Sequence, residues 1–320
     1  MRPPAHPVLK AFTGLLLAAG AASALAAEPL TAFHLNVYRD GAPVNWLAGE
    51  NRLLGDGFDN GDPLVGPNFP NGQAAAYTLQ GLDAGADAAL ALREQGGALL
   101  LDPAYGAVSA NALGQTGRSI RLRLQTNVID SGAGLPRSRS FAAALNLSLA
   151  ALPMQGSSYG MRFADNFSDS SDFIEIAVIG SGGGNLINFR KQDFVTGTIT
   201  QLGSVALAAP AGAVGLLLAL SHSVANTDTI YGSYGFAAAS GTRIGDLVTF
   251  ANATTAFQGE LHTRIELRAT APLPVPEPAA WALMAGGLAG LLLRRRGRPA
   301  AASAGASFAP AAPAGWGAHG

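Results

Sequence analysis

The segment Gly156-Ser157-Ser158-Tyr159-Gly160 has the G-x-S-x-G spacing of a hydrolase nucleophile elbow. Asp228 and His262 follow it in the chain order Ser, Asp, His that one class of hydrolases uses. A nucleophile elbow requires a strand, a sharp turn and then a helix, whereas the residues from 161 to 164 predict a second strand. The spacing therefore does not predict a serine hydrolase.

The spacing of carboxylates gives no better support for catalysis. Retaining glycosidases hold two carboxyl groups about 5–5.5 Å apart across the bond that they cleave. The nearest pair, Asp172 and Glu175, is three positions apart, so its side chains would point to opposite faces of a strand. The chain has no cysteine, and its histidines lack the spacing of zinc ligands. We therefore predict that the protein is not an enzyme.

One acidic loop offers the oxygen ligands that calcium prefers. Asp56, Asp59, Asn60 and Asp62 lie close together in a segment that also contains glycine. Carboxylate and amide oxygens are the usual ligands of Ca²⁺, although the spacing here differs from that of an EF-hand. Asp, Asn and Gly are also common turn residues. The sequence therefore leaves two alternatives open, a weak calcium site and a plain loop. Calcium is the one cofactor that the sequence suggests.

Residues 173–179 offer a candidate sugar-binding face. If Ile174 and Ile176 fill the core, Phe173 and Glu175 lie on the opposite face of the strand. Aromatic rings stack on sugar rings, while carboxylates bind the hydroxyl groups. The candidate ligand face comprises Phe173, Glu175, Phe189, Tyr234 and Phe236. The alternative is that these aromatic residues belong to the core.

Most of the chain alternates apolar and polar residues with the period of two that indicates β-strands. In residues 119–124 this pattern directs Arg121 and Arg123 toward solvent. The residues 173–179 and 185–190 flank a glycine-rich loop and predict a hairpin. Helical spacing is confined to residues 83–95. Further strands are expected at residues 31–38, 75–79, 98–101, 145–149, 194–200, 214–222, 229–236 and 261–268.

Many short strands without intervening helices predict an all-β fold, an antiparallel β-sandwich in which each sheet buries one apolar face against the other. A single domain, residues 28–272, accounts for these strands. Between residues 28 and 274 the chain has 14 Arg and Lys against 20 Asp and Glu, a net charge of −6. This charge argues against nucleic-acid binding, which depends on clustered cations.

The N-terminus has the three parts of a secretory signal peptide. Arg2 and Lys10 introduce the apolar residues 11–22, and Ala24 and Ala26 provide the small side chains that signal peptidase accepts. We expect residues 1–26 to be removed and the remaining chain to be exported across the inner membrane.

The C-terminal region combines an apolar segment with a cluster of arginines. Residues 279–293 carry no charge, and Arg294, Arg295 and Arg296 follow directly. At about 1.5 Å per residue the segment spans about 22 Å, less than the ~30 Å hydrocarbon core of a bilayer. We therefore expect a transient membrane tether with its arginines in the cytoplasm. The Ala/Pro/Gly-rich residues 299–320 predict a disordered tail.

Pro276, Glu277 and Pro278 precede this apolar segment. The order Pro-Glu-Pro, short apolar segment and arginine cluster over residues 275–298 resembles the PEP-CTERM sorting signal of Gram-negative bacteria. The resemblance implies a partner, exosortase, a membrane-embedded cysteine transpeptidase-like enzyme that cleaves near Pro-Glu-Pro and passes the protein to the cell surface or extracellular polymer. The prolines keep the segment extended, which exposes its backbone.

Residues 56–61, 97–102 and 257–260 are similar in their order to pieces of the concanavalin A-like and laminin-G jelly rolls. This resemblance implies a jelly-roll sandwich. Together with the terminal signals, it leads us to expect a non-enzymatic protein with a structural or adhesive role at the cell surface or in a biofilm matrix. The alternatives are a lectin-like, calcium-assisted carbohydrate-binding module and an enzyme that acts on polysaccharide.

Overall fold

The computed structural model describes residues 28–39, 52–110, 116–124, 135–136, 138–165, 172–193, 195–224, 229–255 and 262–273. The expected signal peptide with Ala24 and Ala26, the tail, and the sorting residues Pro276, Glu277, Pro278, Arg294, Arg295 and Arg296 lie outside these ranges. Within them, no helix has the length and apolar character needed to cross a membrane.

Nine strands of the described residues form one antiparallel sheet: β1 (Leu30–Arg39), β2 (Arg52–Asp56), β5 (Leu92–Glu94), β6 (Leu99–Leu101), β10 (Phe141–Ser148), β15 (Gly215–Ser223), β16 (Thr229–Ala237), β17 (Arg243–Thr249) and β18 (Thr254–Thr255). Their order is β17-β16-β15-β10-β1-β6-β5, with β18 beside β16 and β2 beside β1. The central strands β10 and β15 are buried on both faces along most of their length.

Ten further strands form the second sheet: β3 (Val65–Asn68), β4 (Ala74–Gln80), β7 (Ala107–Ala110), β8 (Thr116–Leu124), β9 (Leu135–Pro136), β11 (Ser158–Asp165), β12 (Phe173–Ser181), β13 (Gly184–Gln192), β14 (Ile199–Ala206) and β19 (His262–Pro272). Their order is β14-β13-β12-β11-β19-β8-β4-β3, with β7 beside β8 and β9 beside β19. Neighbouring strands in this sheet are also antiparallel.

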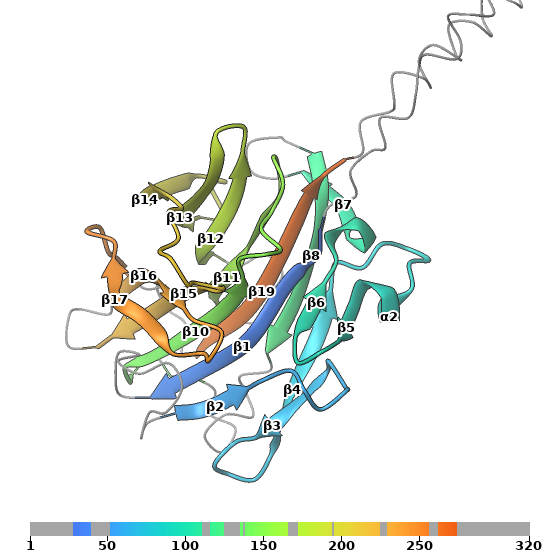
Figure 1. The fold of residues 1–320 in the computed structure, drawn as a ribbon, viewed down its shortest axis with the longest axis horizontal. Helices are drawn as coiled ribbons and strands as arrows, with labels where there is room; N and C mark the ends of the chain where they lie inside the picture. Colours follow the sequence, from blue (N-terminus) through green and yellow to red (C-terminus); the bar gives the residue numbers. More distant parts are fainter. Residues whose placement is uncertain are drawn as a thin grey trace, which may run out of the picture. The chain divides into compact units, whose positions relative to one another are not determined.

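The two sheets, whose strands overlie each other in Figure 1, share one hydrophobic core. Leu145 of β10 and Leu218 of β15 belong to it together with Ile176 of β12 and Leu267 of β19. Across the interface, Phe141 of β10 packs on Phe163 of β11 with ring centroids 5.4 Å apart. The expected all-β fold with two antiparallel sheets is confirmed.

Two elements differ from the sequence-based expectation. The sequence predicts a helix within residues 83–95, but only α2 (Ala88–Ala91) is helical before the chain continues into β5. A 3-10 turn, η2 (Pro103–Tyr105), follows β6. The strand expected over 194–200 begins only at Ile199, because Thr196 and its neighbours form a turn in which the Thr196 amide donates to the Asp193 carboxylate at 2.8 Å.

The hairpin predicted around the glycine-rich loop is present, since Ser181 of β12 pairs with Gly184 of β13. Gly180, next to this loop, packs against the backbone of the segment before β11. Its amide donates to the Ser157 carbonyl at 3.0 Å, and its carbonyl accepts from the Gly156 amide at 3.1 Å. Because Gly180 has no side chain, the two backbones can approach this closely. The two hydrogen bonds then hold Ser157 next to β12.

Replacing Gly180 with alanine is expected to lower the free energy of unfolding by about 1–3 kcal/mol, because the added Cβ would overlap the backbone carbonyl of Met154. Gly183→Ala is the matched control, since nothing lies within 4 Å of a Cβ at that position in the same hairpin. Urea denaturation of both variants measures the difference. Equal losses for the two variants would contradict this account of the close approach.

Candidate functional site

A row of alternating charges crosses the outer face of the ten-stranded sheet, the face turned away from the core. The strand register places Glu175 of β12 between Arg190 of β13 and Arg162 of β11. It likewise places Glu266 of β19 between Arg162 and Arg123 of β8. We call these five residues the charge ladder. Opposite charges directly across neighbouring strands stabilise a sheet.

Both glutamates of the charge ladder are buried, with 1% of Glu175 and none of Glu266 exposed. Arg123 donates from Nε to Oε1 of Glu266 at 3.0 Å. The Nε of Arg264 forms an ion pair with the same oxygen at 2.7 Å, and Arg162 pairs with Oε2. The sequence pattern directed Arg121 and Arg123 toward solvent, but their side chains are only 19% and 13% exposed. They belong instead to the ion-pair network around Glu266.

Glu175 has a similar set of partners. Arg190 donates from Nε to Oε2 at 2.7 Å and also pairs through Nη2, while Nη1 of Arg268 lies 3.3 Å from Oε1. The guanidinium of Arg162 also stacks on the Phe173 ring at 4.7 Å from its centroid. Two arginines thus share the single carboxylate of Glu175.

The arginines keep both glutamates ionised. Burial alone would raise the pKa of Glu175, but Arg190, Arg268 and Arg162 lower it to about 2. Burial opposes ionisation of Glu266 in the same way, and Arg162, Arg264, Arg121 and Arg123 lower its pKa to about 2. A general acid needs a pKa near the working pH, so neither glutamate can donate a proton at neutral pH.

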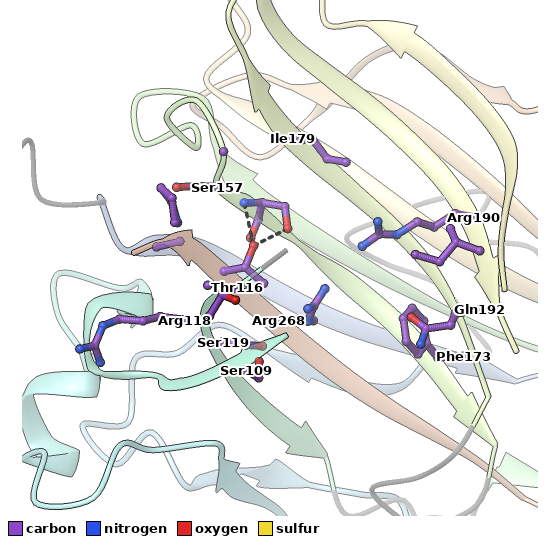
Figure 2. A pocket seen from close by; sticks show the side chains of 17 residues that line it. Ser109, Thr116, Arg118, Ser119, Ser157, Phe173, Ile179, Arg190, Gln192 and Arg268 are labelled. Atoms are coloured by element: carbon purple, nitrogen blue, oxygen red, sulfur yellow. Dashed lines mark hydrogen bonds between the residues drawn. The ribbon is translucent and has the colours of Figure 1, made fainter. Parts of the chain in front are cut away.

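A pocket of about 450 Å³ lies beside the charge ladder on the same outer face. The pocket is built by β7, β8, β11, β12, β13, β14 and β19, together with residues just before β11. Figure 2 shows the side chains of Arg190 and Arg268 extending toward the pocket, whereas Arg118 is directed away from it. Arg118 instead pairs with Asp83 at 2.8 Å. Among the described residues that line the pocket there is no carboxylate.

Hydroxyl groups are frequent in this pocket. Ser158 and Thr270 hydrogen-bond each other through their side chains at 2.7 Å (Figure 2). Ser157 is 1% exposed, and within the described part of the chain its Oγ has no hydrogen-bond partner. A buried hydroxyl without a partner costs about 1–3 kcal/mol, which a ligand atom could offset. The hydroxyl-bearing residues of the pocket are Ser109, Thr116, Ser119, Ser157, Ser158 and Thr270.

The structure does not bring the predicted ligand face together. Phe173 and Glu175 lie on the outer face, as expected, and Phe173 lines the pocket. Phe189 is fully buried in the core, where its ring stacks on Phe250 at 5.8 Å. Tyr234 and Phe236 of β16 pack against the same core from the nine-stranded sheet. For Phe189, Tyr234 and Phe236, the structure therefore agrees with the alternative interpretation, that the aromatic residues belong to the core.

The predicted calcium ligands form a hydrogen-bonded loop after β2. Asp56 is buried, where its Oδ2 accepts from the Tyr77 hydroxyl at 2.6 Å and its Oδ1 from the Phe58 amide at 2.9 Å. Asn60 and Asp62 accept from the amides of Asp62 and Leu64 at 2.8 and 3.0 Å. Asp59 interacts electrostatically with the carboxylate of Asp56. Over the described ranges, no group of three or more His, Cys, Asp or Glu is arranged to hold a metal ion.

The serine motif lies at the edge of the pocket. Ser158 is the first residue of β11, so a strand follows the serine directly, as the sequence indicated. Gly156 has a φ of 83° in the turn before it. This geometry lacks the helix of a nucleophile elbow.

Sequence reasoning missed the charge ladder. The signal was present, because Arg264, Glu266 and Arg268 alternate along one predicted strand and Arg121 and Arg123 along another. Alternation places each set on one face of its strand, but it does not show which strands are neighbours. The order β12-β11-β19-β8 supplies that information.

The described residues thus define a class: a two-sheet antiparallel β domain with an ionic outer face and a pocket. Residues 274–296, directly after β19, match the family model of the PEP-CTERM protein-sorting motif. The chain therefore carries this motif, the recognition signal for exosortase, and is an exported protein that is processed at the membrane. Comparison with curated proteins and with solved structures found no match, so no structural neighbour supports the jelly-roll identity.

Proposed function

We propose that this protein serves a non-enzymatic, structural or adhesive role at the cell surface or in the extracellular matrix. The observation that carries the proposal is the PEP-CTERM sorting motif at residues 274–296. The motif begins directly beyond the last residues of β19, so cleavage by exosortase near Pro276 to Pro278 would release the β domain with its last long strand intact.

Two features of the outer face support a role without catalysis. The carboxylates of Glu175 and Glu266 are buried and each is bound by several arginines. Both have a pKa of about 2, so they are unsuited to the acid step of glycoside hydrolysis. A polysaccharide-acting enzyme therefore has less support than a binding or structural protein.

The lectin-like alternative retains support, but from other residues than the sequence suggested. The pocket on the outer face combines guanidinium, hydroxyl and aromatic groups, a mixture typical of ligand sites. Calcium assistance stays a prediction from the sequence. In the structure, hydrogen bonds within the protein hold the loop from Asp56 to Asp62.

Replacing Pro276, Glu277 and Pro278 together with alanine is expected to leave most of the protein unprocessed in the membrane fraction of the native host. The wild-type protein should instead end near residues 276–278, which intact-mass measurement determines directly. The control carries Pro310→Ala and Pro313→Ala in the C-terminal tail and should be processed like the wild type. A wild-type product that still carries Arg294 to Arg296 outside the cell would contradict sorting by exosortase.

A further inference from the structure

We propose that the pocket on the outer face of the ten-stranded sheet binds the carboxylated sugar units of an acidic polysaccharide. This inference deepens the proposed matrix role, and its biological meaning rests on that role. Binding by the purified protein can nevertheless be measured whether or not the protein is sorted by exosortase. The two proposals therefore fail separately.

The charges around the pocket favour an anion. Arg190 and Arg268 extend toward the pocket (Figure 2), and both are bound to the same carboxylate, that of Glu175. Two guanidinium groups and one carboxylate leave one positive charge beside the pocket. Arg118 is balanced by Asp83 and adds nothing to this charge. A ligand with one carboxylate per unit would neutralise this positive charge.

The arginines also have hydrogen-bond donors to offer. A guanidinium carries five N–H donors in a planar fork that suits bidentate binding of a carboxylate. The bonds to Glu175 engage Nε and Nη2 of Arg190 and Nη1 of Arg268. Each arginine thus keeps further N–H groups for a ligand while Glu175 holds its guanidinium in place.

The remaining lining favours a sugar over a simple inorganic anion. Six of the lining residues carry hydroxyl groups, and Gln192 adds an amide. Ser157 supplies a buried Oγ without a partner in the described part of the protein, which is the position where a ligand hydroxyl would complete a hydrogen bond. Ile199 and Pro272 provide apolar surface for the C–H groups of a sugar ring.

The size of the pocket agrees with this ligand. Its volume of about 450 Å³ falls within the range of about 300–1,000 Å³ that is usual for small-molecule sites. A pocket of this size holds a small ligand such as a sugar unit rather than a folded protein segment. The ligand that fits the charge, the hydroxyl groups and the volume together is a uronate unit within a polysaccharide chain.

The test uses the full-length chain purified in detergent and isothermal titration calorimetry with three probes. These are a galacturonate oligosaccharide, a neutral galactose oligosaccharide of the same length, and inorganic sulfate. We expect the galacturonate oligosaccharide to bind at least about tenfold more tightly than either other probe, because only this probe engages both the arginines and the hydroxyl groups. The affinity should fall as the salt concentration rises.

Two variants locate the binding in the pocket. Ser157→Ala removes a hydroxyl that has no partner in the described protein, so the fold should tolerate it, and binding should weaken about threefold to tenfold. Arg268→Gln should weaken binding by about tenfold or more, with thermal melting used to verify that the variant is folded. Arg243→Gln is the matched control, because Arg243 pairs with Asp246 on β17 of the other sheet.

Several outcomes would overturn the proposal. Absence of galacturonate binding would end it, as would equal binding of the neutral oligosaccharide. Competition by sulfate at the same concentration would show an anion site without selectivity for sugars. Unchanged affinity of Ser157→Ala and of folded Arg268→Gln would place any binding outside this pocket.

Discussion

Replacing Glu266 with glutamine is expected to lower the free energy of unfolding by about 3–5 kcal/mol at pH 7. Glu266 is completely buried and forms ion pairs with Arg162, Arg264 and Arg123. Glutamine keeps the shape of the side chain but removes the negative charge. The arginines around it would then repel one another where little solvent is available to screen them.

Asp83→Asn provides the control for this prediction. Asp83 also forms an ion pair with an arginine, Arg118, but its side chain is 41% exposed. Solvent screens such a pair, so its loss should change stability far less than the loss of Glu266. Urea denaturation at pH 7 compares both variants with the wild type. A Glu266→Gln variant as stable as Asp83→Asn would mean that the charge ladder does not stabilise the sheet.

The sequence predicts the fold well where one face of a strand is buried and the other is polar. β8 is such a strand, since Ile120, Leu122 and Leu124 are buried and alternate with more polar positions. The alternation fails in β10 and β15, which are buried on both faces: Ala142, Ala144, Leu217 and Ala219 form a second apolar cluster on the side away from the main core. In such strands the pattern indicates burial but does not identify the face.

The same limit explains the errors at the candidate site. Phe173 and Phe189 lie on paired strands, and the sequence does not show that Phe189 is opposite Ile176 and therefore in the core. The partners of Glu175 come from β13 and β19, which are far apart in the chain. Strand order and register determine such contacts, and both depend on the packing of the whole domain. The sorting motif needed no such information, because its parts are consecutive in sequence.

Acidification is expected to destabilise the folded domain between about pH 5 and pH 2. Glu175 and Glu266 each have a folded-state pKa of about 2 against an ordinary value of 4.5. A carboxyl group whose pKa is lowered by folding stabilises the protein above its unfolded pKa, and that stabilisation is lost as the pH falls toward the folded pKa. Each glutamate should therefore contribute about 3 kcal/mol at pH 7 that is absent below about pH 2.

Urea denaturation of the wild type and of Glu266→Gln at pH 7, 5, 4 and 3 separates this contribution from that of other carboxylates. The buried Asp56 acts in the opposite direction, because burial raises its pKa and favours its protonated form in the folded state. That contribution is common to both proteins and cancels in the comparison. The wild type should lose stability more steeply than Glu266→Gln, so the gap between the two should narrow as the pH falls. A gap that stays constant from pH 7 to pH 3 would show that Glu266 has an ordinary pKa in the folded protein and that its arginines do not hold it ionised.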